Sequence, residues 1–201
     1  MKTINLPYYR TFAQVVDKQN LTDDKIKEID GERTIQFGQI DLAEKDKLLE
    51  TAKDNGGKIL YSTTSLEKKL EDIIGIFFFG KNPVTIEKVK FFNNEFLKDS
   101  RLTFSFKKEL VQKILNNSKL ISGKDKNRIQ KNLKGIMDWR NAFAHGTLHY
   151  NNISGCVIQY YSSGNQTLVL DDAYWDLVEK TFIETDSIAD RIIQNLNKDK
   201  A

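Results

Sequence analysis

The segment MDWRNAFAHG (residues 137–146) contains Arg140, Asn141 and His145, whose side chains could act together on a phosphate group. A guanidinium group donates parallel hydrogen bonds that match phosphate oxygens, which the point charge of a lysine does not. Histidine accepts and releases protons near neutral pH. Because the chain has only two histidines, we take these three residues as the first candidates for a functional site.

The candidate residues lie in a predicted amphipathic helix that covers about residues 124–145. The residues that recur in it at intervals of three or four are Ile129, Leu133, Ile136, Arg140 and then Phe143 or Ala144. This pattern predicts that Arg140 is buried, and a buried guanidinium needs a carboxylate, a helix terminus or an anionic ligand as its partner. Asn141 and His145 lie four residues apart at the edge of the same face, and Gly146 is expected to end the helix.

Upstream of this segment the sequence predicts further helices. They are expected at residues 41–57, 64–80, 85–97 and 105–118. Gly56 is expected to end the first helix, and Thr64 with Glu67 has the spacing of a capping box that begins the second. The phenylalanines of the runs 77–79 and 91–92 could stack on bases, but their helical spacing favours the core, with any residue left over contributing to a dimer interface. A short helix at 7–16 and a short strand at 34–40 are the predictions for the least regular part of the chain.

Downstream of the segment the pattern changes to that of strands. β-Branched and aromatic residues predict a hairpin of 156–161 against 167–170, with a third short strand at 147–150. A long amphipathic helix then starts after Asp171 or Asp172. The predicted fold class is mainly α: an up-and-down helical bundle with a β-hairpin inserted before the last helix.

Composition limits the class of protein. The chain has 201 residues, of which 39% are hydrophobic, and this suits one domain with a core of its own. The single cysteine, Cys156, suits a reducing compartment. The start of the chain lacks the apolar region of a signal peptide, and the apolar run 73–80 is too short to span a bilayer. We therefore expect a soluble, cytoplasmic protein whose net charge of +3 permits a phosphate-rich partner.

The order Arg-Asn-x-x-Ala-His in RNAFAHG resembles the signature of the HEPN superfamily, and the helices on either side agree with it. The resemblance covers about residues 62–198. We accordingly divide the chain into an N-terminal extension of uncertain structure, residues 1–60, and a HEPN-like helical domain, residues 61–201.

Similarity to this superfamily implies a metal-independent endoribonuclease without a cofactor, often a toxin or an antiphage-defence effector. It also implies a homodimer in which the two motif helices meet in a cleft, and a possible antitoxin or regulatory protein as a further partner. Arg140 and His145 carry over as catalytic residues and Asn141 as the polar residue that supports them. One branch of the superfamily has a tyrosine two residues after the histidine, where this chain has Thr147, so regulation through that tyrosine is not expected.

The implied chemistry suits these residue types. Cleavage of RNA through its 2′-OH requires removal of the hydroxyl proton, stabilisation of the charged phosphorane and protonation of the 5′-oxygen. One histidine cannot easily serve as both base and acid, whereas a twofold dimer supplies two.

Other residues are weaker candidates. Basic side chains accumulate before the motif, and among them Lys134, together with His149 after it, could contact substrate. No spacing of histidines and cysteine predicts a metal site. In the main alternative, the bundle is a non-catalytic module that binds nucleic acid or nucleotides and dimerises, with Arg140 in a structural ion pair. It could also be an antitoxin or adaptor held to another chain.

Overall fold

The computed structural model describes residues 1–7, 42–80, 86–97, 99, 102–151 and 154–198, and it is mainly helical. The elements in chain order are the helices α1 (Leu42–Phe79), α2 (Ile86–Phe91), the π-helix η2 (Phe92–Leu97), α3 (Phe104–Asn116) and α4 (Gly123–His145), the strands β1 (Thr147–Asn151), β2 (Gly155–Tyr161) and β3 (Asn165–Val169), and the helix α5 (Asp172–Lys198). The predicted fold class, mainly α with a β-hairpin before the last helix, is confirmed in the types of the elements and their order.

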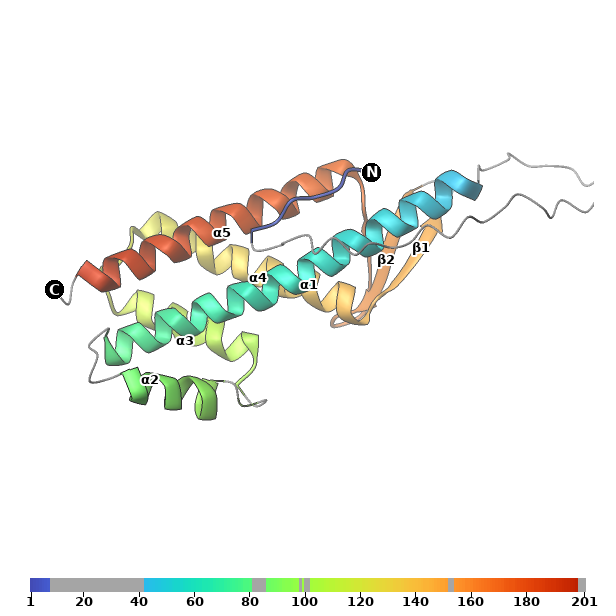
Figure 1. Cartoon of the computed structure of the whole chain (residues 1–201). Coiled ribbons are helices and arrows are strands. Elements are labelled where there is room, and N and C mark those ends of the chain that lie inside the picture. The colour runs from blue at the N-terminus through green and yellow to red at the C-terminus, as the bar shows by residue number, and fades with distance from the viewer. Residues whose placement is uncertain (8–41, 81–85, 98, 100–101, 152–153, 199–201) are drawn as a thin grey trace, which may run out of the picture.

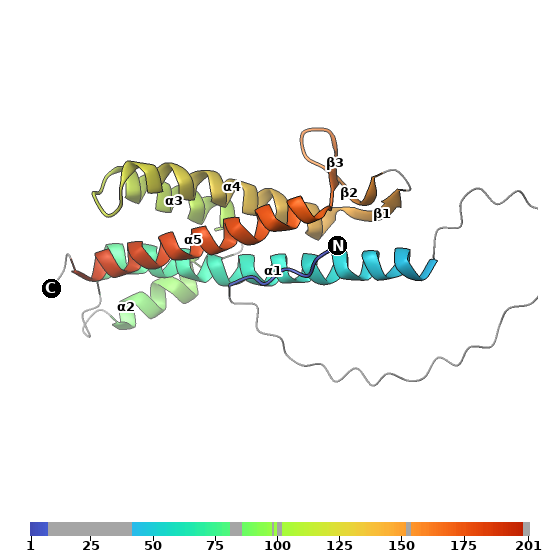
Figure 2. The ribbon, with the colours of Figure 1, turned by 90° about the horizontal axis from the view of Figure 1, so that it is seen from above.

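Successive helices run in alternating directions along one long axis (Figure 1). Seen from above, α3 and α4 lie on one side of the bundle and α1 and α2 on the other, with α5 against both α1 and α4 (Figure 2). The small sheet lies at the end of the bundle where α4 finishes and α5 begins (Figure 1). The fold therefore brings the C-terminal end of α4, which carries the candidate residues, next to the sheet.

A single helix replaces the two that were expected between residues 41 and 80. The 38-residue helix α1 runs without a break through Gly56, so the predicted stop there is wrong. A Cβ atom on Gly56 would lie 2.5 Å from the ring of Phe143 in α4, so this glycine allows α1 and α4 to approach closely. The predicted capping box is also wrong: the Thr64 hydroxyl donates to the carbonyl of Leu60 within the helix.

The first residues of the chain pack against the bundle. Ile4 is fully buried, and its backbone N–H donates to Oδ1 of Asn55 in α1 at 3.1 Å. Asn55 in turn donates to the carbonyl of Lys2 at 3.0 Å, and Nζ of Lys58 donates to the carbonyl of Ile4 at 3.0 Å. The dark-blue segment lies between α1 and α5 in Figure 2. The proposed division at residue 60 falls inside α1 and does not coincide with a break in the structure.

The sheet agrees with the prediction. β2 pairs antiparallel with both β1 and β3, and His149 of β1 lies opposite Val157 of β2. Cys156, Val157 and Ile158 of β2 are buried and join the core. The last helix begins after Asp171, whose Oδ1 accepts the N–H of Tyr174 at 2.7 Å.

Part of the aromatic content lies outside the core. The exposed fractions are 54% for Phe78 and 70% for Phe91, so the prediction that these two are core residues is wrong. Phe79 and Phe92 instead pack on each other with ring centroids 5.2 Å apart. The helix predicted at 85–97 consists of α2 and the π-turns of η2. The expected elements at 7–16 and 34–40 fall outside the described residues, apart from Pro7. Within the described part of the chain, no helix has the length and apolar character needed to cross a membrane.

Candidate functional site

The C-terminal part of α4 extends beyond α3, and this decides the surroundings of Arg140. α3 ends and α4 begins at the same connection, and the two helices run back along each other, but α3 has 13 residues and α4 has 23. At 1.5 Å per residue their lengths are about 20 Å and about 35 Å, so the last turns of α4 have no α3 beside them. Arg140 lies in this part and is exposed, and the prediction that it is buried is wrong.

The apolar residues between the candidates hold this part of α4 in place. Ala142 is fully buried, and Phe143 packs on Trp175 of α5 with ring centroids 5.9 Å apart. Trp139 makes an edge contact with Tyr174 at 6.1 Å. Trp139 rather than Arg140 therefore continues the packed stripe of α4. The polar residues of the motif are left on the outside of a helix whose other side is fixed by aromatic contacts.

α4 ends at His145, and Gly146 follows in an extended conformation. This position has no room for a side chain. Its N–H donates to the carbonyl of Ala142 at 2.7 Å, and its φ of −85° is open to any residue. A Cβ atom would lie 2.4 Å from the carbonyl oxygen of Ala142 and 2.9 Å from that of Gln159 in β2. The glycine thus lets the helix end pack directly on the sheet, which fixes the place of His145.

Arg140 and Asn141 line a pocket of about 430 Å³ between α4 and the start of α3. The other residues around it are Glu67, Asp99, Leu102, Thr103, Phe104, Ser105, Lys107 and Met137. Thr103 caps α3: its side chain accepts the N–H of Phe106 at 3.4 Å. The N-terminus of α3 adds the partial positive charge of a helix dipole to this pocket.

A buried lysine binds two glutamates at the edge of the pocket, Glu67 and Glu71. Nζ of Lys107 lies 2.6 Å from Oε1 of Glu67 and 2.6 Å from Oε1 of Glu71, and its side chain is only 4% exposed. Burial opposes the charge of Lys107, but the hydrogen bonds to the two carboxylates outweigh it and hold the pKa of Lys107 above its ordinary value. Glu67 is therefore engaged by Lys107.

Arg140 keeps its charge available for a ligand. Nη1 of Arg140 donates to Oδ1 of Asn141 at 3.2 Å, which orients the guanidinium. Within residues 42–80, 86–97, 99, 102–151 and 154–198, no carboxylate forms a salt bridge with it. The structural ion pair considered in the sequence analysis is thus not made by the described residues. An exposed, oriented and unpaired guanidinium in a pocket is suited to binding an anion.

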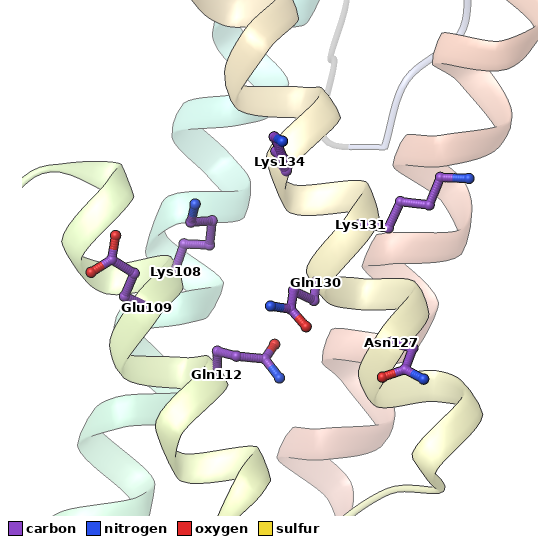
Figure 3. A pocket seen from close by; sticks show the side chains of 7 residues that line it. All are labelled: Lys108, Glu109, Gln112, Asn127, Gln130, Lys131 and Lys134. Atoms are coloured by element: carbon purple, nitrogen blue, oxygen red, sulfur yellow. The ribbon is translucent and has the colours of Figure 1, made fainter.

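The remaining candidates lie outside this pocket. His145 is exposed at the last position of α4, and His149 is exposed on β1. Arg140 and His145 are five residues apart, which in a helix separates their directions by about 140°. Lys134 lines a different pocket, one to two turns earlier on α4 (Figure 3). Within a single chain, Arg140 and Asn141 therefore line the same pocket, whereas His145 lies on a different side of the helix.

Sequence reasoning did not find the cluster of Lys107 with Glu67 and Glu71: it took Lys107 as one of several basic residues before the motif and Glu67 as part of a capping box. The two glutamates lie four residues apart on α1, a spacing that places both carboxylates on one face. That spacing was visible in the sequence, but nothing local could identify the lysine of α3 that lies between them. Among the described residues, no group of three histidines, cysteines or carboxylates could hold a metal ion.

Comparisons of this chain with protein-family models, with curated proteins and with solved structures give no match. The function of the site is therefore inferred from the residues of the chain itself.

Proposed function

We propose that this protein is a HEPN-like, metal-independent endoribonuclease that acts as a homodimer in the cytoplasm, as a toxin or an antiphage-defence effector. The observation that carries the proposal is the exposed guanidinium of Arg140. It is oriented by Asn141, has no carboxylate partner among the described residues, and lies on the same helix end as His145. An arginine for phosphate and a histidine for protons are the groups that RNA transphosphorylation needs.

In the proposed reaction, Arg140 binds the non-bridging oxygens of the scissile phosphate and stabilises the phosphorane that forms. One histidine removes the proton of the 2′-OH, and the oxygen attacks phosphorus. A second histidine gives its proton to the 5′-oxygen as the bond between phosphorus and that oxygen breaks. The products are a 2′,3′-cyclic phosphate and a 5′-hydroxyl, and no metal ion takes part in these steps.

A homodimer provides the second histidine. The C-terminal turns of α4 extend beyond α3, and Arg140 and His145 on them are exposed, so two copies of this helix end can face each other across a twofold axis. Such a cleft contains two copies each of Arg140 and His145. The wide angle between these residues within one chain then becomes useful, because the histidine of one protomer can reach a phosphate held by the arginine of the other.

Expression in a bacterial host tests the proposal. We expect the wild-type chain to slow growth and to degrade cellular RNA, and Arg140→Ala and His145→Ala to be tolerated. Arg128→Ala is the control, because Arg128 is an exposed arginine of the same helix that lies 4.0 Å from Glu184, outside the pocket. Equal growth with the wild type and both motif variants, at equal levels of soluble protein, contradicts the proposal.

A further inference from the structure

A second pocket follows the seam between α3 and α4. It has a volume of about 470 Å³ and is lined by Lys108, Glu109 and Gln112 of α3 and by Asn127, Gln130, Lys131 and Lys134 of α4. Figure 3 shows Lys108, Gln112, Gln130 and Lys134 around the space between the two helices. Neither Arg140 nor His145 belongs to this lining, so the pocket is separate from the proposed cleavage site.

The pocket is positively charged. Within the described part of the chain, Lys108, Lys131 and Lys134 have no carboxylate partner, in contrast to Lys107, the buried neighbour of Lys108. Glu109 is the one acidic residue in the lining, and Figure 3 shows its carboxylate directed away from α4. Oε1 of Glu109 instead accepts the hydroxyl of Ser105 at 3.4 Å. Lys108 and Lys134 therefore lie at the space between the two helices with charges available for an anion, whereas Figure 3 shows the amine of Lys131 directed away from α3.

The remaining side chains of the lining are amides. Gln112 donates to Oδ1 of Asn116 at 3.0 Å, which leaves its own carbonyl oxygen available. Gln130 and Asn127 are exposed on the α4 side of the same pocket. Amides offer both donors and acceptors without charge, which suits ribose hydroxyls and base edges. Lysines for phosphates together with amides for sugars and bases match a nucleic-acid strand better than a simple inorganic anion.

The two pockets follow one another along the same pair of helices. Lys107 lines the pocket of Arg140 and Lys108 lines the second one, while Lys134 and Asn141 are separated by two turns of α4. Those seven residues correspond to about 10.5 Å at 1.5 Å per residue. A strand whose bases stay stacked rises about 3.4 Å per nucleotide, as in a duplex, and needs roughly three nucleotides to cover that distance.

We infer that the groove between α3 and α4 binds the single RNA strand that flanks the scissile phosphate, about three nucleotides away from it. This inference rests on the proposed ribonuclease function. Gln112 and Gln130 can contact base edges only where the bases are unpaired, so this lining favours a single strand over a duplex. Lys108 and Lys134 contact its phosphates, and Gln112 and Gln130 contact its sugars or bases.

Binding of RNA to an inactive protein tests the inference. The probe is a fluorescein-labelled, 12-nucleotide single-stranded RNA, bound to the His145→Ala protein, with the same RNA as a duplex for comparison. The groove variant adds Lys108→Gln and Lys134→Gln. The matched control adds Lys113→Gln and Lys180→Gln, which remove two exposed helical lysines outside the groove.

We expect the groove variant to bind the single strand more weakly and with less dependence on salt. Each lost phosphate contact lowers the slope of log affinity against log salt by about 0.7, so two contacts lower it by about 1.4 and weaken binding roughly 25-fold at 0.1 M salt. The control variant and the duplex probe should not show this effect. In the active protein, the same two groove substitutions should raise KM and leave kcat within about twofold.

Equal affinity and equal salt slopes for the groove variant and the control overturn the inference, as does tighter binding of the duplex. These outcomes are independent of cleavage. If the wild-type protein binds RNA in the groove but cuts nothing, the proposed function fails while the binding result remains. If the wild type cuts RNA and the groove variant has an unchanged KM, the groove inference fails alone.

Discussion

Arg140 and His145 occupy the same exposed end of α4, but their local roles differ. Arg140 lines a pocket with Asn141 as its hydrogen-bond acceptor, whereas His145 ends the helix where Gly146 packs on β2. The availability of Arg140 depends on Lys107, since Glu67 borders the same pocket and is bound by that lysine. Arg140 is thus an unpaired cation, and the ion pair between Lys107 and Glu67 keeps that carboxylate from binding it.

Substitution of Lys107 tests this arrangement. Lys107→Met leaves Glu67 and Glu71 without their cation in a largely buried place, and we expect the free energy of unfolding to fall by about 3–5 kcal/mol. Adding Glu67→Gln and Glu71→Gln removes the uncompensated charges and should restore most of it. Chemical denaturation at pH 7 measures all three proteins. A Lys107→Met protein as stable as the wild type contradicts a structural role for the lysine.

The same cluster predicts a dependence on alkaline pH. Because the folded state raises the pKa of Lys107 above 10.5, its contribution to stability is complete below that pH and is lost as the pH rises through the folded-state pKa. Above pH 10.5 the wild type should therefore lose stability more steeply than the variant with all three substitutions. The difference between their slopes is at most about 1.4 kcal/mol per pH unit.

At the scale of elements, the position of the site depends on how closely helices pack. α1 and α4 meet where Gly56 faces the ring of Phe143, a residue between Asn141 and His145 in the sequence. On its other side Phe143 contacts Trp175 of α5. The ring of Phe143 thus holds the end of α4 against both α1 and α5. Because this ring points into the bundle, the polar residues of the motif point outward.

Two neighbouring glycines of α1 provide a matched test of this packing. A Cβ atom on Gly56 would contact the Phe143 ring at 2.5 Å, whereas one on Gly57 would meet nothing within 4 Å. Gly57→Ala should stabilise the protein by about 0.5–1 kcal/mol through helix propensity. Gly56→Ala should destabilise it by about 1–3 kcal/mol through overpacking. Thermal unfolding measures both, and equal shifts of Tm for the two variants contradict the close approach of α1 and α4.

The elements that the sequence predicted well are those with local signals. α4, the three strands and α5 follow from periodicity, from Gly146 and from Asp171, all of which act within a few residues. α1 was divided in error because Gly56 looks like a helix stop when its tertiary contact with Phe143 is unknown. The exposure of Arg140 was not predicted because the periodicity of α4 alone assigns it to the packed stripe, whereas its exposure follows from the length of α3 relative to α4, which the predicted ranges 105–118 and 124–145 already contained.

At the scale of the whole molecule, the proposed chemistry needs two protomers. A single chain offers one exposed histidine at the end of α4, and His149 lies apart on β1. The end of the bundle that carries the sheet also carries both motif residues, so this end is the expected dimer interface (Figure 1). The opposite end of α4 leads into the groove proposed for the flanking strand (Figure 3).

Mixed dimers test the need for two histidines. Wild-type and His145→Ala chains with different tags are produced together at known ratios, and cleavage is measured per total protein. If both histidines of a dimer are needed, activity follows the square of the wild-type fraction, so an equal mixture retains about one quarter. Activity that follows the wild-type fraction linearly means that one protomer acts alone, and the dimeric mechanism is then wrong.

Cleavage of RNA by the purified protein in EDTA tests the central claim most directly, with the wild type compared with His145→Ala. We expect the wild type to cut RNA in the presence of EDTA and to leave 2′,3′-cyclic phosphate ends, and we expect His145→Ala not to do so. If the wild type and the variant are both folded dimers and neither cuts RNA, the ribonuclease assignment is contradicted; if both cut it equally, the catalytic role of His145 is contradicted. A folded dimer that binds RNA without cutting it is instead the non-catalytic binding module.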